Sequence, residues 1–398
     1  MPSIANIVRV KEENVPLMNT MYFAFFTSGM MSTLIGALLP FMKTEYAMGY
    51  VLSGAVISAH QVGNFCALLI AGFLPSLIGR KKSTLVLSMG IAIGFMLATL
   101  TANPVLLLLA FAFTGIGRGS LSNITNVVIS EVSENKTSAL NLLHAFFAVG
   151  AFVAPFLAIL STTVFGVHWR LSAWILVAFE IVALFAIGFS SLSGKPVEKK
   201  NDCGAGFAKS GSYWLNTFIL FFYLCSEASV IGWLVTYFND TGILNTAMAQ
   251  MTSSALWLCI LAGRLLCASL ATRVDRNLLL VILGTFQVIF FILMISVHSV
   301  VLIYLCIFGF GLAMSGTYPT TLSTMDRRFN SSTLATGTCI AVATLGAIAM
   351  PIIVGLVAHR SGIAGGLATI SISLCCMLTL IVLKFVQSRR ADKVVQAA

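Results

Sequence analysis

The chain has 398 residues, of which 58% are hydrophobic and only 9% are charged, and its mean hydropathy is +0.98. A soluble domain carries about 25% charged residues, so a soluble fold of this composition would have to expose large apolar surfaces. The net charge of +10 comes from basic residues scattered between apolar segments, which argues against a nucleic-acid partner. The composition indicates a membrane protein, in which only helices or closed barrels satisfy the backbone.

Apolar windows of roughly twenty residues follow one another along the chain, without the period-2 alternation of barrel strands. We therefore predict an all-α polytopic membrane protein with twelve transmembrane helices. The first sixteen residues are mixed and polar, unlike a cleaved signal peptide. The predicted spans are 17–40, 50–74, 84–101, 104–129, 138–163, 170–193, 212–238, 247–271, 278–297, 300–324, 333–358 and 363–386.

The longest polar interruption, at 194–211, is rich in Gly and Lys and divides the spans six and six. It predicts a flexible linker between an N-terminal bundle at 1–193 and a C-terminal bundle at 212–398. Eighteen Lys and Arg residues outside or at the edges of the spans fall on one side of the membrane and three on the other. Cytoplasmic loops carry the excess of positive charge, so both termini and the linker are predicted to be cytoplasmic.

Short sequences recur at a constant offset. LPSLIGR at 74–80 follows the second span and LATRVDR at 270–276 follows the eighth, an offset of 196. GAFVAP at 150–155 and GAIAMP at 346–351 differ by 196 as well, while GIG at 115–117 and GFG at 309–311 differ by 194. Matches in corresponding spans predict a parallel duplication of six helices.

The loop after the second span has the sequence GFLPSLIGRKK at 72–82. It resembles the loop signature of the major facilitator superfamily, in which a Gly is followed by an acidic residue, another Gly and a basic cluster. Ser76 stands at the acidic position, so the charge relay credited to that loop is not supported here. The resemblance implies a twelve-helix transporter that is not an enzyme, with gating or structural roles for Gly72, Gly79, Arg80 and Lys81.

Further stretches resemble the fucose permease-like branch of that superfamily, which includes sodium-dependent glucose transporter-like proteins. They are GRGSLSNITN at 117–126, LNLLHAFFAVG at 140–150, YLCSE at 223–227 and the Gly263-Arg264 pair. Fucose permease itself uses an acidic residue in the first helix and another in the fourth for proton coupling. The matching positions here are Gly36 and Ser122, so coupling through that pair is not supported.

Glu227 lies near the middle of the seventh span, where an ionisable group is a functional hypothesis by default. Tyr223 precedes it by four residues and shares its helix face. The carboxylate could bind a cation, carry a proton or accept hydrogen bonds from solute hydroxyls, or it could serve as a structural contact between helices. Trp233, Trp257 and Tyr318 offer rings of the kind that sugar sites use, although most aromatic residues in such a chain pack or face lipid.

Arg118, Ser122 and Asn126 form one stripe on the fourth span. Arg118 could hold an anionic group or stack under a sugar ring, or it could neutralise Glu227. His144 on the fifth span aligns with a sugar-contacting position of the resembled family and could also carry a proton.

His60, Gln61 and Asn64 cluster on the second span, either as polar contacts between helices or as substrate contacts. Glu180 lies in the middle of the sixth span, which the resemblance puts outside the cavity, and we expect it to pair with a neighbouring helix. Arg264, near the cytoplasmic end of the eighth span, is predicted to seal an inward gate.

These observations predict a secondary active or facilitative transporter that moves a small polar solute, such as a monosaccharide, across the cytoplasmic membrane by alternating access. No cofactor or metal is expected, because the five histidines lack metal-ligand spacing and no P-loop is present; a coupling ion would be H⁺ or Na⁺. The expected partners are the solute and the lipid bilayer, with a monomeric protein. An efflux antiporter for drugs or organic anions and a non-transporting membrane sensor remain as alternatives.

Overall fold

The computed structural model describes residues 9–71, 73–193, 206–270, 273–326, 329 and 332–397. Within these ranges the regular structure is helical, apart from an isolated antiparallel bridge between Val10 and Ser133. Gly72 and residues 194–205 of the predicted linker lie outside the described residues. The all-α prediction is therefore confirmed for the part of the chain that the structure describes.

The long helices follow the predicted spans in chain order, and most begin and end within a few residues of the predicted limits. The short elements are a 3-10 helix at Glu12–Asn14, α4 (Leu74–Ile78), a π-helical turn at Leu160–Val164 and a 3-10 helix at Phe207–Lys209. The long helices are α2 (Val15–Glu45), α3 (Tyr50–Ala71), α5 (Arg80–Leu100), α6 (Pro104–Val132), α7 (Lys136–Ile159), α8 (Arg170–Phe189), α9 (Gly211–Asp240), α10 (Thr246–Leu270), α11 (Arg276–Ser296), α12 (Val300–Ser323), α14 (Thr333–Ala368) and α15 (Ile370–Ala397).

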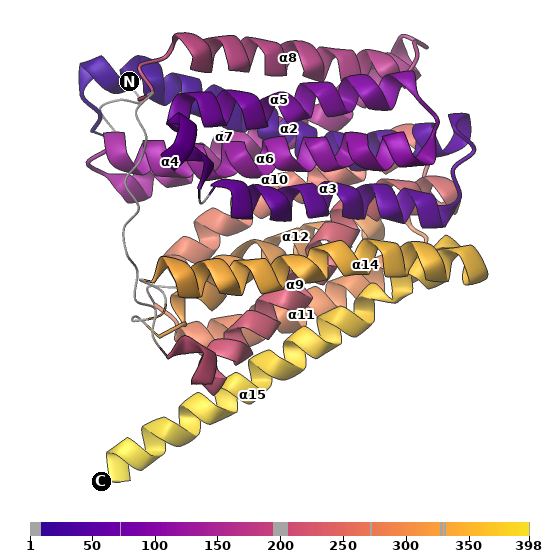
Figure 1. Ribbon diagram of the computed structural model, residues 1–398. Helices are drawn as coiled ribbons and strands as arrows, with labels where there is room; N and C mark the ends of the chain where they lie inside the picture. The colour runs from indigo at the N-terminus through magenta and orange to yellow at the C-terminus, as the bar shows by residue number, and fades with distance from the viewer. Residues whose placement is uncertain are drawn as a thin grey trace. The chain divides into compact units, whose positions relative to one another are not determined.

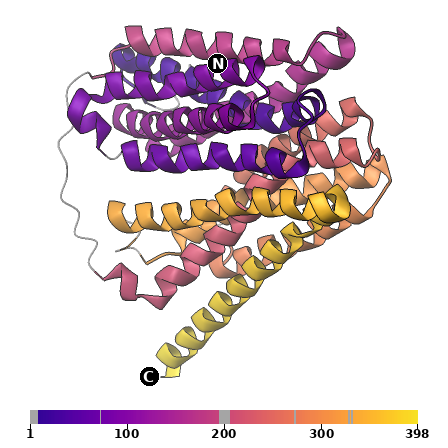
Figure 2. The ribbon, with the colours of Figure 1, turned by 45° about the vertical axis from the view of Figure 1, so that its right-hand side comes forward.

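The last long apolar stretch contains two predicted spans. The described residues hold eleven helical stretches that are long and apolar enough to cross a membrane, and the last, Leu334–Arg390, has 57 residues. One crossing needs about 20. At Gly362 the backbone leaves the helix with φ 78° and ψ 167°, a conformation that is essentially restricted to glycine. In two views α14 and α15 meet at one end and diverge along their lengths (Figures 1 and 2), so this stretch accounts for the two predicted spans 333–358 and 363–386.

The chain forms two compact units, which we call unit 1 (Met1–Met48 with Ala55–Lys200) and unit 2 (Gly49–Gly54 with Asn201–Ala398). In unit 1, α2 packs against α6, α7 and α8, while α5 packs against α6 and α8. In unit 2, α9 packs against α14 and α15, while α12 packs against α10 and α11. The first long helix of each unit is the most enclosed, because 83% of the apolar window of α2 and 67% of that of α9 is buried.

The same close helix crossing occurs in both units. A Cβ on Gly150 of α7 would lie 2.0 Å from the carbonyl oxygen of Phe26 in α2. In unit 2, a Cβ on Gly346 of α14 would lie 2.4 Å from the carbonyl oxygen of Phe221 in α9. Small residues allow membrane helices to approach backbone to backbone, and here the two contacts repeat at offsets of 196 and 195 residues.

A second crossing pairs α3 with α6 and, in the other unit, α10 with α12. A Cβ on Gly115 would lie 1.9 Å from the carbonyl oxygen of His60, and one on Gly311 would lie 3.0 Å from that of Leu256. Gly311 follows Gly115 by 196 residues, and Leu256 follows His60 by 196 residues. The contact matches Gly115 with Gly311, so the sequence pairing of Gly115 with Gly309 at 194 is corrected.

Candidate functional site

The predicted site residues of unit 2 gather around Tyr223 of α9. Its hydroxyl lies 2.9 Å from Oε1 of Glu227, one turn further along the helix, and 3.3 Å from the carbonyl oxygen of Met314 in α12. The ring of Tyr318 lies 6.1 Å from that of Tyr223, measured between centroids. Arg264 of α10 is a charged neighbour of the same phenol.

This group can bind a polar solute through hydrogen bonds. Tyr223 is buried, whereas Glu227 is only partly buried, so the phenol orients a carboxylate that retains an accessible side. A carboxylate accepts several hydrogen bonds at once, and its bonds to hydroxyl donors are stronger than those of a neutral acceptor. Arg264 acts electrostatically on Tyr223, and its expected role in sealing an inward gate stays a prediction.

The two predicted tryptophans of unit 2 are enclosed. Trp233 is 0% exposed, and its indole Nε1 donates to the carbonyl oxygen of Pro351, 3.2 Å away in α14. Trp257 is 4% exposed. Trp233 therefore joins α9 to α14, and its ring presents no exposed face to a solute.

In unit 1, Arg118 and His144 lie on either side of a pair of phenylalanines. The guanidinium carbon of Arg118 lies 5.8 Å from the ring centroid of Phe147, a distance typical of cation–π contacts. Phe147 packs on Phe25 at 5.0 Å, and the His144 ring meets Phe25 edge-on at 5.4 Å. The structure thus brings together two predicted residues from α6 and α7.

The rest of the predicted stripe on α6 is engaged within its own helix. The side-chain amide nitrogen of Asn126 donates to the backbone carbonyl of Ser122 at 2.6 Å. Both side chains are partly buried. Their predicted contact with a solute stays a prediction.

His60 joins α3 to α6. Its Nδ1 lies 2.9 Å from the hydroxyl of Thr114, which in turn lies 2.7 Å from the carbonyl oxygen of Phe111. A hydroxyl has one proton, and because the carbonyl takes it, His60 Nδ1 is the donor and Nε2 the acceptor nitrogen. Asn64 on the same face lies against Gly119 of α6, while the neighbouring Gln61 is partly buried.

Arg80, in the basic cluster of the predicted loop signature, forms an ion pair with a carboxylate on another helix. Gly79, with φ 83°, ends α4 and precedes α5. Arg80 then pairs with Glu131 of α6 at 2.6 and 2.9 Å, and Lys81 donates to the carbonyl oxygen of Ser190 at 2.9 Å. Sequence reasoning missed Glu131, although an acid just after the fourth span is a signal that could have suggested it.

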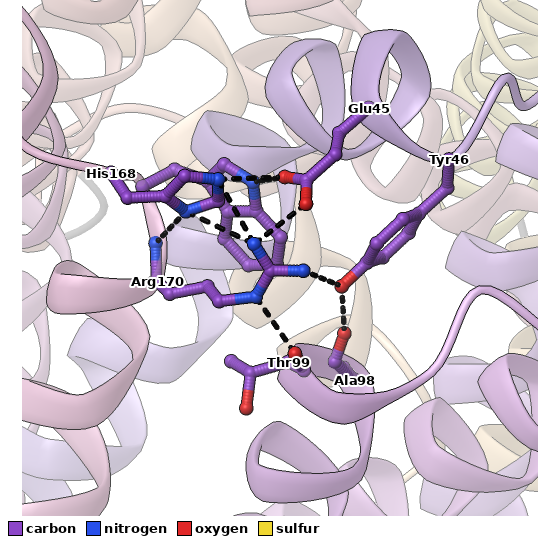
Figure 3. A network of polar contacts seen from close by, with 7 residues as sticks. Glu45, Tyr46, Ala98, Thr99, His168 and Arg170 are labelled. Carbon is purple, nitrogen blue, oxygen red and sulfur yellow. Dashed lines mark hydrogen bonds and ion pairs between the residues drawn. The ribbon is translucent and has the colours of Figure 1, made fainter.

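A polar cluster at the other end of unit 1 was also missed (Figure 3). One carboxylate oxygen of Glu45, at the end of α2, lies 2.6 Å from Nη1 of Arg170. The other oxygen lies 3.0 Å from Nε2 of His168 and accepts a hydrogen bond from the indole of Trp169 at 2.5 Å. Three successive residues before and at the start of α8 thus bind one carboxylate.

The same cluster extends to α5. Arg170 donates Nε to the carbonyl oxygen of Thr99 at 2.7 Å and Nη2 to the hydroxyl of Tyr46 at 3.1 Å. Burial raises the pKa of the Tyr46 phenol above its ordinary value, so the phenol stays protonated and donates to the carbonyl oxygen of Ala98 at 2.9 Å. The ends of α2, α5 and α8 are joined through one arginine.

Comparison with known proteins identifies the family. The model for the Major Facilitator Superfamily matches residues 21–351, most of the chain. The chain belongs to this superfamily. Its family and fold are those of transporters, which are not enzymes, and its apolar helices make it a multi-pass membrane protein. Among the described residues, no group of three His, Cys, Asp or Glu side chains is placed to hold a metal ion.

Three proteins similar to this chain are distant from it in sequence. "Bypass of stop codon protein 6" of Saccharomyces cerevisiae is 24% identical over 399 residues, covering 88% of this chain and 79% of the yeast protein. The nucleoside transporter NupG superposes with a TM-score of 0.75 at 14% identity, over 94% of this chain and 100% of its own. The E. coli fucose:proton symporter FucP gives 0.61 at 16% identity, over 94% and 99%. These structures share the fold, and the fucose permease-like branch stays a prediction.

Proposed function

We propose that this transporter moves a small polyhydroxylated solute, most simply a monosaccharide, by alternating access. The observation that carries the proposal is the hydrogen bond between Tyr223 and Glu227, with the Tyr318 ring and Arg264 beside it. The carboxylate accepts bonds from solute hydroxyls, and an aromatic face packs against the C–H face of a sugar ring. The names of the two solved relatives agree with this choice, because fucose is a sugar and a nucleoside contains one.

Glu227 is the proposed coupling group, with H⁺ or Na⁺ as the ion and His144 as a second proton carrier. A carboxylate at membrane depth is costly unless it is paired or hydrated. Tyr223 donates a hydrogen bond to this carboxylate, and a proton or Na⁺ bound to the carboxylate would compete with that bond and with the hydroxyls of the solute. Binding of the ion and of the solute would thereby be linked at one side chain.

We further propose that the protein lies in the cytoplasmic membrane with both termini in the cytoplasm. In unit 1, basic residues gather at the end that holds the Val10–Ser133 bridge, the Arg80–Glu131 pair and the Lys81–Ser190 contact. This end belongs to the side with eighteen of the basic residues. Labelling with a membrane-impermeant maleimide tests the orientation: Cys203 of the predicted linker should react in inside-out vesicles and not in intact cells, with Cys203→Ser as the control.

Uptake into proteoliposomes tests the transport activity. A panel of radiolabelled sugars is offered under an imposed proton or sodium gradient to the wild type and to Glu227→Gln. We expect one gradient to drive accumulation of a sugar in the wild type, and Glu227→Gln to allow only equilibration. Absence of uptake of every sugar under both gradients would overturn the sugar proposal.

A second candidate function, transport of organic anions, is favoured by the positions of two arginines. Arg118 is held on the ring of Phe147, and Arg264 lies beside Tyr223. If the sugar panel gives no uptake, counterflow of radiolabelled organic anions in the same vesicles distinguishes this function. Arg118→Gln should then abolish anion exchange.

A further inference from the structure

Glu180 is a buried carboxyl group in α8 that the proposed function does not use. It is 0% exposed, and neither of its carboxyl oxygens has a hydrogen-bond partner among the residues that the structure describes. The sequence led us to expect a polar partner on a neighbouring helix. Thr27 of the neighbouring helix α2 is a polar neighbour of the carboxyl, but no hydrogen bond of good geometry reaches either oxygen from the described residues.

Among the described residues, the polar neighbour of the Glu180 carboxyl offers it an acceptor. Thr27 of α2 lies against the carboxyl. Its hydroxyl donates its only proton to the carbonyl oxygen of Ala24, 2.8 Å away. Towards Glu180, Thr27 therefore presents an oxygen lone pair. A neutral carboxylic acid can donate to that oxygen, whereas a carboxylate would meet only its lone pair.

The charges on the helices around α8 lie far from Glu180. At one end Arg170 pairs with Glu45 of α2, and at the other Lys81 of α5 donates to the carbonyl oxygen of Ser190. Glu180 is ten residues from Arg170 and ten from Ser190, about 15 Å at 1.5 Å per residue. The remaining ionisable side chains of α2, α5 and α7 are Lys43, Arg80, Lys82 and Lys136 near helix ends, His144, which lies against Phe25, and Tyr22, which donates to the carbonyl oxygen of Ala139.

An unpaired carboxylate in such a place would be strongly disfavoured, because the side chain is 0% exposed and no cationic side chain among the described residues pairs with it. We infer that Glu180 is a proton-binding site, held as the neutral acid in the contact between α2 and α8. The site is in unit 1 and is distinct from the Tyr223–Glu227 pair of unit 2. Any state of unit 1 that admits water to this contact lets the proton leave, so proton binding favours the closed contact.

Infrared spectroscopy of the purified protein in lipid at neutral pH tests the inference. A neutral carboxylic acid has a C=O stretch that is separate from the amide and carboxylate bands. We expect this band in the wild type and its loss in Glu180→Gln. The band should be retained in Glu131→Gln, because the Glu131 side chain of the wild type is exposed. The comparison is repeated in a Glu227→Gln background, so that a contribution from Glu227 does not obscure the loss.

Labelling of glutamate side chains with ¹³C provides a test that needs no variant, since the band should move to lower frequency in the labelled wild type. A spectrum without the band, or a band that survives in Glu180→Gln, would overturn the inference. Sodium binding would give a different result: Na⁺ would raise the unfolding temperature of the wild type and not that of Glu180→Gln, and the neutral-acid band would be absent. None of these readouts requires the solute, so a failure of the sugar proposal would leave the proton site standing.

Discussion

Arg80 and Glu131 form a two-point ion pair between the start of α5 and the end of α6, with Nη1–Oε2 at 2.6 Å and Nη2–Oε1 at 2.9 Å. The loop before Arg80 has Ser76 where the superfamily signature has an acid, and the hydroxyl of Ser76 turns back to the carbonyl oxygen of Phe73. The guanidinium instead takes its carboxylate from a helix 51 residues further along the chain. A basic cluster can therefore keep a partner after the nearby acid is lost.

A double-mutant cycle should detect this pair as a weak coupling. The side chains are 21% and 51% exposed, and solvent screening limits such pairs to about 1 kcal/mol or less. We expect Arg80→Ala and Glu131→Ala each to lower the free energy of unfolding slightly. The double variant should lose less free energy of unfolding than the sum of the two single losses. Additive effects, measured by thermal unfolding in detergent, would show that the pair is not coupled.

Glu45→Gln should destabilise unit 1 more than the same change at Glu131. The carboxylate of Glu45 binds Arg170, His168 and Trp169 and is 32% exposed, so we expect a loss of about 1.5–3 kcal/mol, the range for hydrogen bonds to charged groups. Glu131→Gln is the matched control, because it removes one charge from a more exposed pair. Equal shifts in unfolding temperature would contradict the expectation.

Alanine at the repeated crossing should disrupt helix packing. In Gly150→Ala the new Cβ would lie 2.0 Å from the carbonyl oxygen of Phe26, and backbone cannot move aside as a flexible side chain can. We expect a loss of at least about 2 kcal/mol, as for severe overpacking, and a similar result for Gly346→Ala. Gly188→Ala in α8 is the control: nothing lies within 4 Å of its Cβ, and helix propensity predicts a gain of up to about 1 kcal/mol.

Gly362→Ala isolates backbone strain from packing. No atom lies within 4 Å of a Cβ at this position, but φ is 78°. We expect a loss of about 1–3 kcal/mol from the strained conformation alone. Gly337→Ala, in the regular part of α14 and equally uncrowded, should be neutral or stabilising; a comparable loss there would point to a cause other than the break.

Tyr223→Phe should weaken solute binding while leaving the ring in place. The variant removes the 2.9 Å hydrogen bond to Glu227, and a bond to a charged acceptor is worth about 1.5–3 kcal/mol, so we expect KM to rise about tenfold or more. Tyr237→Phe on the same helix is the control, because its hydroxyl bonds to the carbonyl oxygen of Ile295. Initial rates of uptake over a range of solute concentrations give both values of KM.

Hydropathy predicted where helices lie better than where they end. The first span was predicted to end at 40, yet α2 continues to Glu45. Charged residues lower the hydropathy there, but Glu45 stays in the helix because it is paired with Arg170, 125 residues further along. That partnership depends on which helices are neighbours, and no single-span pattern contains this information.

The candidate site was predictable within a helix and not between helices. Spacing of four residues predicted that Tyr223 and Glu227 share a face, and their hydrogen bond confirms it. The neighbours of Arg264 and Glu180 depend on other helices: Arg264 acts on Tyr223 of α9, and Glu180 has Thr27 of α2 as its polar neighbour. The repeat at 196 residues was visible in the sequence. The match of Gly115 with Gly311, and not with Gly309, came only from the contact of Gly311 with the carbonyl oxygen of Leu256.

The glycine crossings also explain how such a protein can diverge. Where a helix crosses this close to a carbonyl oxygen, only glycine fits. The crossing does not restrict which side chains stand at the neighbouring positions. Residues that face lipid or solute can then be replaced without loosening the frame that carries them. NupG and FucP share the fold over 94% of this chain at 14% and 16% identity.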